Sequence, residues 1–83
     1  MVIYKYQITG SDCEIEMPEG SNVLTAHEQN GRICVWAEVD TSKPLEKRRF
    51  VTVGTGYESP ADGTYIGTAF IYAYVMHVYE IKK

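Results

Sequence analysis

The sequence lacks several features that would each point to a class of protein. Its 83 residues include only two cysteines, whereas small secreted domains are usually held together by more disulfides. We expect Cys13 and Cys34 to be buried small hydrophobic residues, with a disulfide between them as the alternative. Residues 1–8 alternate like a strand rather than a signal peptide, and no apolar run is long enough to span a bilayer. The expectation is a single soluble, cytoplasmic domain over residues 1–83.

The sequence also lacks a large excess of positive or negative charge. The net charge is −3, with −5 in residues 1–40 and +2 in residues 41–83. This leaves too little positive charge for a general nucleic-acid binder and too little negative charge for a mimic of DNA. A small anion that meets a local basic cluster remains compatible with the sequence. The two histidines are too few for a zinc site, which needs three or four ligands, so we expect no metal and no cofactor.

What the sequence does contain is a strong hairpin signal, Asn30-Gly31, in the middle of residues 23–40. A two-residue turn of this kind needs φ > 0 at both positions and fixes the register of its two strands. A short helix over residues 22–29, with Ser21 as its N-cap, is the alternative. The predicted cross-strand pairs are Gln29–Arg32, His27–Cys34, Thr25–Trp36 and Leu24–Ala37.

This register divides the hairpin into two faces. One face is apolar except for Glu28 beside the turn, and we expect it to be buried. Its apolar residues are Leu24, Ala26, Ile33, Val35, Ala37 and Val39. The opposite face is chemically mixed, and we expect function or a partner near it. It carries Thr25, His27, Gln29, Arg32, Cys34, Trp36 and Glu38.

The remaining strands are predicted from apolar residues that alternate with polar ones at 2–8, 13–17, 48–53, 64–70 and 74–81. No segment shows sustained 3.6-residue periodicity. We therefore predict an all-β fold, a small antiparallel barrel or sandwich of about six to seven strands.

Two segments are predicted to lie outside the strands. Residues 41–47 are polar and contain Pro44, which is typical of a surface connection. Residues 54–63 form the longest irregular stretch, and long loops on rigid scaffolds often carry binding residues.

Seven tyrosines are too many for a core of this size to enclose with satisfied hydroxyls. Several must therefore lie at the rim or in a subunit interface, which leads us to expect a homo-oligomer.

The candidate ligand-binding residues include a basic pair, Arg48-Arg49, and the loop Gly54-Thr55-Gly56-Tyr57. Guanidinium groups suit phosphate, glycines let backbone N–H groups approach an anion, and an aromatic ring can stack on a base. The alternatives are ion pairs of the arginines with an acid such as Glu14 or Glu16, and a simple turn at the glycines.

Trp36 and His77 complete the candidate set. The ring of Trp36 can stack on a base, or else fill a core or an interface. His77 is either a ligand contact or a packed histidine with satisfied nitrogens. A nucleophilic pair of His27 and Cys34 would lack an oxyanion hole and a third orienting group, so no catalytic residue and no enzyme is expected.

At these residues the chain resembles a family of small uncharacterised proteins from phages and prophage-bearing bacteria. It departs from the family at Tyr57, where a histidine is frequent, and at residues 71–73, where the family turn is richer in glycine. The matching blocks are Gln29-Asn30-Gly31, Trp36-Ala37, Val39-Asp40, Arg48-Arg49-Phe50, Gly54-Thr55-Gly56, Tyr65-Ile66-Gly67-Thr68 and His77-Val78-Tyr79-Glu80.

The resemblance implies a phage-type accessory protein in the cytosol of the host cell. Together with the candidate residues it predicts a non-enzymatic binder that sequesters a phosphorylated small molecule, such as a nucleotide signal of host antiviral defence. The alternatives are a protein that binds and inhibits a host defence complex, through its acidic N-terminal strands and exposed tyrosines, and a virion accessory protein.

Overall fold

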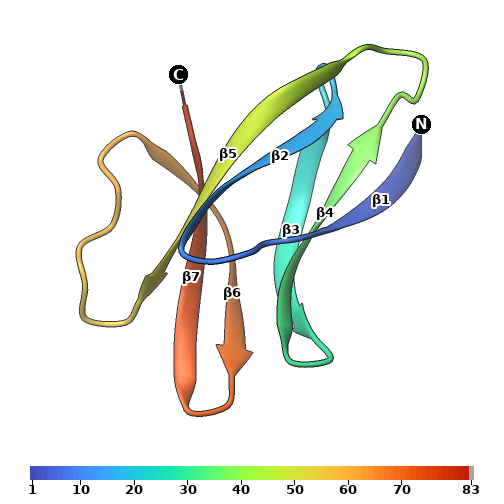
Figure 1. The fold of residues 1–83 in the computed structure, drawn as a ribbon. Coiled ribbons are helices and arrows are strands. Elements are labelled where there is room, and N and C mark those ends of the chain that lie inside the picture. Colours follow the sequence, from blue (N-terminus) through green and yellow to red (C-terminus); the bar gives the residue numbers. More distant parts are fainter. Residues whose placement is uncertain (83) are drawn as a thin grey trace.

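The computed structural model describes residues 1–82 and folds them into seven strands without a helix (Figure 1). No helix long and apolar enough to cross a membrane is therefore found in this part of the chain. The strands are β1 (Val2–Gln7), β2 (Asp12–Pro18), β3 (Asn22–Gln29), β4 (Arg32–Val39), β5 (Leu45–Gly54), β6 (Gly63–Ile71) and β7 (Tyr74–Ile81).

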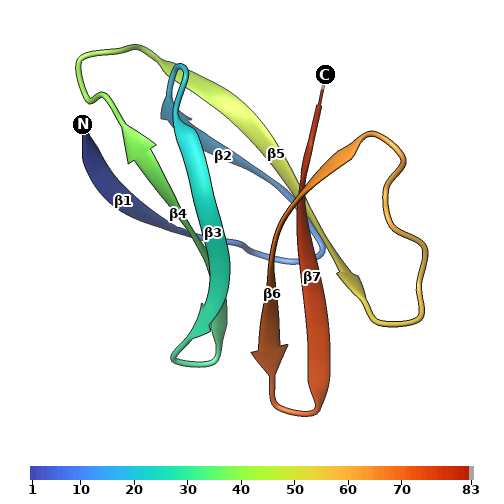
Figure 2. The ribbon, with the colours of Figure 1, turned by 180° about the vertical axis from the view of Figure 1, so that it is seen from behind.

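The strands form two antiparallel sheets that pack face to face as a sandwich rather than as a closed barrel. One sheet has the order β1-β4-β3 and the other the order β2-β5-β7-β6 (Figures 1 and 2). On one side of the sandwich β3 lies against β6, where a Cβ on Gly67 would be only 2.6 Å from the carbonyl oxygen of Ala26. On the other side no ladder joins β1 to β2, and both are edge strands.

The core lies between the sheets and takes large side chains from both. Successive side chains of a strand point to opposite faces, so every second residue of a strand faces the core, and these positions are mostly apolar. The largest fully buried side chains are Phe50, Met17, Val35, Val39 and Val78.

The hairpin prediction is confirmed at the turn and corrected at its far end. Asn30 and Gly31 have φ of 54° and 77°, residues 22–29 form a strand, and His27 lies opposite Cys34 as predicted. The predicted pair of Leu24 with Ala37 is wrong. A bulge between Val23 and Thr25 places Val23 opposite Ala37 instead, and leaves Leu24 43% exposed.

β5 also begins earlier than the sequence predicted. Residues 45–47, expected in a surface connection, pair with β2 through Leu45–Pro18 and the two pairs that follow. The cysteines are free thiols, Cys34 buried and Cys13 half-buried. Residues 55–62 form the predicted long loop.

Candidate functional site

The structure distributes the predicted site residues over three separate places. Trp36 is on the outer face of the three-stranded sheet, directly across from Lys5 on β1 and Thr25 on β3. Its half-buried ring lies 6.3 Å, centroid to centroid, from the ring of His27. None of the other candidate residues belongs to this sheet, so Trp36 does not join them in one site.

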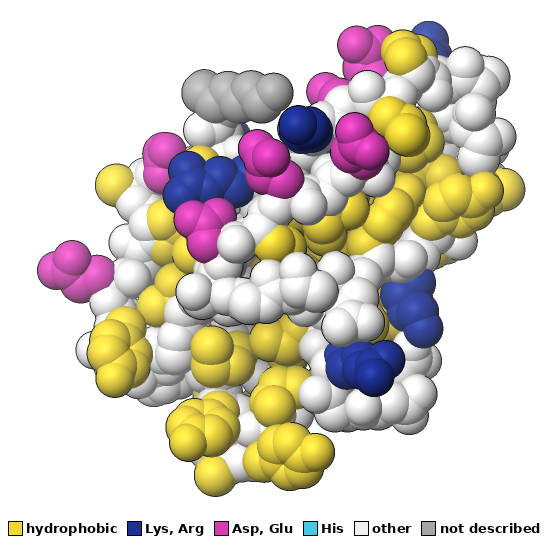
Figure 3. Space-filling model, viewed as in Figure 1, with side chains coloured by type: hydrophobic (Ala, Val, Ile, Leu, Met, Phe, Trp, Pro, Cys, Tyr) yellow, Lys and Arg dark blue, Asp and Glu magenta, His cyan; other side chains and the backbone are white. Residues whose placement is uncertain are grey.

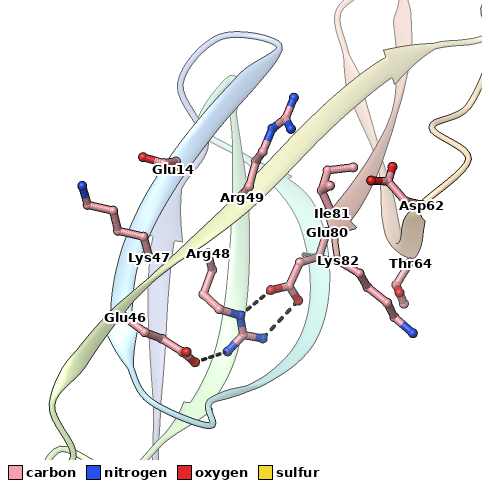
Figure 4. A pocket seen from close by; sticks show the side chains of 10 residues that line it. All are labelled: Glu14, Glu46, Lys47, Arg48, Arg49, Asp62, Thr64, Glu80, Ile81 and Lys82. Carbon is pink, nitrogen blue, oxygen red and sulfur yellow. Dashed lines mark hydrogen bonds and ion pairs between the residues drawn. The ribbon is translucent and has the colours of Figure 1, made fainter.

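Arg48 points into one end of the sandwich and is held by carboxylates. Its Nε and Nη2 donate to the carboxylate of Glu80, the latter at 3.0 Å, and its Nη1 lies 3.3 Å from Glu46 (Figure 4). Nη1 also donates to the backbone oxygen of Ser21 at 3.0 Å. The hydrogen bonds to Glu80 are the main reason that the pKa of Arg48 is raised.

This arrangement fastens the β2–β3 turn to β5 and β7. Glu46 accepts a hydrogen bond from the backbone N–H of Gly20 at 3.1 Å, next to the Ser21 oxygen that Arg48 contacts. A cavity of about 570 Å³ lies around these groups, and Figure 4 shows acids and bases mixed around it. Because its acidic side chains neutralise its basic ones, this cavity is poorly suited to an anion.

Arg49, the next residue, points to the outer face of the same sheet. Its Nε and Nη2 donate to the two carboxylate oxygens of Asp12 at 2.9 and 2.7 Å. The hydrogen bond from Arg49 lowers the pKa of Asp12, and the same contact raises the pKa of Arg49. Arg49 therefore forms an ion pair with an acid of β2, as the alternative predicted, but the acid is Asp12 rather than Glu14 or Glu16.

The loop residues of the prediction come together with His77 but not with the arginines. One small depression of about 200 Å³ has Gly54, Thr55, Gly56, Tyr57 and His77 in its lining. Gly54 lies six positions after Arg48 on β5, which corresponds to about 20 Å along a strand. Among residues 1–82, the side chains that line this depression include no lysine and no arginine.

His77 is a packed histidine whose two ring nitrogens both have partners. Nε2 lies 2.9 Å from the hydroxyl of Thr55, and Nδ1 lies 3.1 Å from the hydroxyl of Thr68. The chain of polar contacts continues from Thr68 to the hydroxyl of Tyr65. These hydrogen bonds link β6, β7 and the start of the long loop. His77 therefore matches the second of its two predicted roles, a packed histidine with satisfied nitrogens.

A cavity that the sequence did not reveal lies at the other end of the sandwich. It is widely open to solvent and measures about 690 Å³, within the usual size range of ligand sites. The β1–β2 connection, the β3–β4 turn and the β6–β7 turn surround it, so its lining is far apart in the sequence. Its lining includes residues 9–11, the basic Arg32, the aromatic Tyr74 and the apolar Met76.

Arg32 differs from the other arginines in its surroundings. It is exposed, and no ion pair or side-chain hydrogen bond joins it to another residue within 1–82. The sequence placed Arg32 on the mixed face of the hairpin, directly after the turn. This position was the only feature of the sequence that could have indicated the site, because a hairpin turn and its flanking residues must lie at an end of the sandwich.

Among residues 1–82, no group of three His, Cys, Asp or Glu side chains is placed to hold a metal ion. A family model described as a domain of unknown function, DUF7352, matches residues 1–83. No curated protein and no solved structure matches the chain.

Proposed function

Since the chain belongs to the DUF7352 family of domains of unknown function, we propose its function from the structure: it binds a small phosphorylated ligand in the cavity beside Arg32. The observation that carries the proposal is that Arg32, an exposed arginine joined to no acid within residues 1–82, is among the residues that line a cavity of ligand size. Guanidinium groups bind phosphate through paired hydrogen bonds, and an arginine already engaged by carboxylates must lose those contacts first.

The rest of the cavity suits the other parts of such a ligand. Gly10 and Gly31 both lie in its wall with positive φ and carry no side chain to block the approach of an anion to the backbone. Tyr74 offers an aromatic ring for stacking on a base, and Met76 offers an adaptable apolar surface. Cation, backbone donors and aromatic ring are the three elements that the sequence predicted, here supplied by different residues.

The finer parts of the proposal come from the sequence resemblance to phage proteins. We propose that the ligand is a nucleotide signal of host antiviral defence and that the protein sequesters it in the host cytosol. Sequestration requires binding and no chemistry, so the proposed protein is not an enzyme and needs no cofactor.

Thermal unfolding with a panel of cyclic and linear nucleotides tests this proposal. A ligand at about 100 times its Kd adds about 2.7 kcal/mol to the free energy of unfolding. For a domain of this size that raises Tm by about 10–20 °C. Arg32→Gln should abolish the shift, whereas the matched change Arg49→Gln should preserve it. If no nucleotide stabilises the wild-type protein, or if Arg49→Gln alone abolishes the shift, the assignment of the site is wrong.

A second candidate function, binding and inhibition of a protein, is favoured by the tip of the β6–β7 hairpin. Phe70, Tyr72 and Tyr74 are exposed there, and Figure 3 shows hydrophobic side chains gathered over this tip. Tyr72 is 92% exposed and has φ of 52°, a backbone conformation that is unfavourable for a bulky residue. Strain without a packing gain points to a role in binding. The same tip would serve a virion accessory protein.

The acidic version of this alternative has less support than the aromatic one. Glu14 and Glu16 lie opposite Arg49 and Lys47 on β5, so the acidic row of β2 is beside a basic row. Co-precipitation from bacterial lysate tests the aromatic version. Tyr72→Ser should reduce recovery of a partner, while Tyr57→Ser, at a tyrosine that is 80% exposed elsewhere, should leave it unchanged. Equal recovery with both variants would remove the hairpin tip as the binding surface.

A further inference from the structure

The edge strands of the two sheets are protected against pairing with another strand, with one exception. An unpaired edge exposes backbone N–H and C=O groups, and proteins usually block it with charges, proline, bulges or a covering element. β2 carries three acidic residues on its outer face and ends at Pro18. β3 and β6 each contain a bulge and lie against each other at Ala26 and Gly67.

The exception is β1. It contains no proline or glycine, and its register with β4 has no bulge. Val2, Ile3 and Tyr4 are all exposed, Ile3 by 60%. The one charged residue, Lys5, does not shield the edge, because its Nζ donates to Gln29 on β3 at 2.6 Å and so reaches across β4.

The hydrogen-bonding pattern shows which backbone groups of β1 are free. The N–H of Ile8 donates to the oxygen of Ile33 at 2.8 Å, and the register of β1 places these two residues opposite each other. In an antiparallel pair every second residue bonds to the same neighbour. Val2, Tyr4 and Tyr6 therefore bond to β4, and the N–H and C=O groups of Ile3, Lys5 and Gln7 point to the open edge.

We propose that β1 pairs antiparallel with β1 of a second copy of this chain, so that the two three-stranded sheets become one sheet of six strands. A twofold axis perpendicular to the sheet keeps inner faces on the same side, so an even-numbered residue must lie opposite an even-numbered one. The register with Tyr4 on the axis meets this condition. It places Ile3 opposite Lys5 of the second copy, and Val2 opposite its Tyr6.

Charge excludes one neighbouring register of this pairing. Shifting the pairing by one allowed step toward the C-terminus would place Lys5 opposite Lys5 of the second copy, and like charges directly opposite each other destabilise a sheet. With Tyr4 on the axis, the only charge of each strand faces an isoleucine. The open groups of Ile3 and Lys5 then satisfy each other, and the exposed apolar side chains of Val2 and Tyr4 are covered. The strand is thus complementary to itself.

Disulfide trapping in a Cys13→Ala background tests the pairing and its register. Two Cα atoms at a non-hydrogen-bonded pair lie about 4.5 Å apart, within disulfide range. Tyr4→Cys should therefore give a covalent dimer on mild oxidation. In the same register two cysteines at position 5 would be about 8–9 Å apart, so Lys5→Cys should stay monomeric. A dimer from Lys5→Cys alone would overturn the register, and no dimer from either variant would overturn the proposal.

A change of charge provides an independent test without cysteine. Sedimentation should show that Ile3→Glu, which faces Lys5 of the second copy, dimerises more strongly than wild type, and that Ile3→Lys dimerises less. Within its own sheet Ile3 lies opposite Glu38, so Ile3→Glu should destabilise the monomer and Ile3→Lys should stabilise it. Thermal unfolding measures this effect on the monomer separately from dimerisation. A wild-type protein that sediments as a monomer at every concentration contradicts the proposal and leaves the edge to a strand of another protein. This inference does not depend on the proposed ligand.

Discussion

The two ends of the sandwich both carry an arginine, and the two arginines have opposite surroundings. At one end Arg48 is bound by Glu46, Glu80 and the backbone of Ser21, and its side chain is only 18% exposed. At the other end Arg32 is exposed, and no ion pair joins it to any residue in the described part of the chain. The first arginine maintains the fold, and the second is available for a ligand.

Whether an arginine is free to bind a ligand therefore depends on the acidic residues around it. Sequence reasoning named the adjacent residues Arg48 and Arg49 as candidate phosphate contacts, with ion pairs as the alternative. In the folded chain this adjacency separates them, since neighbouring residues of a strand point to opposite faces. Each of them then meets carboxylates on its own face, at Glu80 and at Asp12.

The largest expected effect contrasts the two ends directly. Arg48→Met should lower the free energy of unfolding by about 2–3 kcal/mol, because it leaves Glu80 and the oxygen of Ser21 without their partner in a partly buried site. Arg32→Met should change it by less than about 0.5 kcal/mol, as an exposed substitution. Urea denaturation followed by circular dichroism measures both. Equal losses would show that Arg32 also maintains the fold.

An intermediate effect is expected from the β3–β4 and β6–β7 turns, where Gly31 and Tyr72 both have positive φ. Tyr72→Gly should stabilise the protein by about 1 kcal/mol, because glycine adopts this backbone without strain. Gly31→Ala should destabilise it by a similar amount for the same reason. Ala73→Gly, one residue further along, is the control and should only destabilise, by about 0.4–1 kcal/mol. Thermal unfolding measures all three. A loss on Tyr72→Gly would mean that the tyrosine ring stabilises the fold.

The smallest effect concerns the exposed ion pair of Arg49 and Asp12. The pKa of Asp12 lies below its usual 3.8 because Arg49 donates to it, so this pair stabilises the fold above that pH. The contribution is lost as the pH falls through the lowered pKa. Arg49→Gln should return the pKa of Asp12 toward 3.8, as measured by NMR titration. Asp40 is the internal control, because hydrogen bonds from Ser42 lower its pKa and these remain. A low pKa of Asp12 in the variant would assign the shift to another group.

Local features were predictable from the sequence, and features that depend on strand order were not. The Asn30-Gly31 turn fixed its own register because both residues adopt positive φ. No residue of the hairpin predicts the bulge that displaces Leu24, and the strand that carries it packs against β6, whose residues are about forty positions away. The exposure of most tyrosines followed from their number alone: only Tyr6 and Tyr79 are half-buried rather than exposed.

The candidate site shows the same division. The pairing of Arg48 with Glu80 requires β7 to be the neighbour of β5, and nothing in either strand specifies that order. The cavity beside Arg32 is built by three connections that meet only in the folded chain. Sequence reasoning found the kinds of group that such a site needs, but it could not place them together.

The contact between Gly67 and Ala26 has a consequence for how this fold diverges among relatives. Because a Cβ at residue 67 would meet the backbone of the opposite strand, the distance between the sheets at this corner is set by main-chain atoms alone. Core substitutions can widen or narrow the sandwich along β1 and β2, whereas the corner at β3 and β6 keeps its width. Family members with a side chain at this position should therefore show a shifted β3.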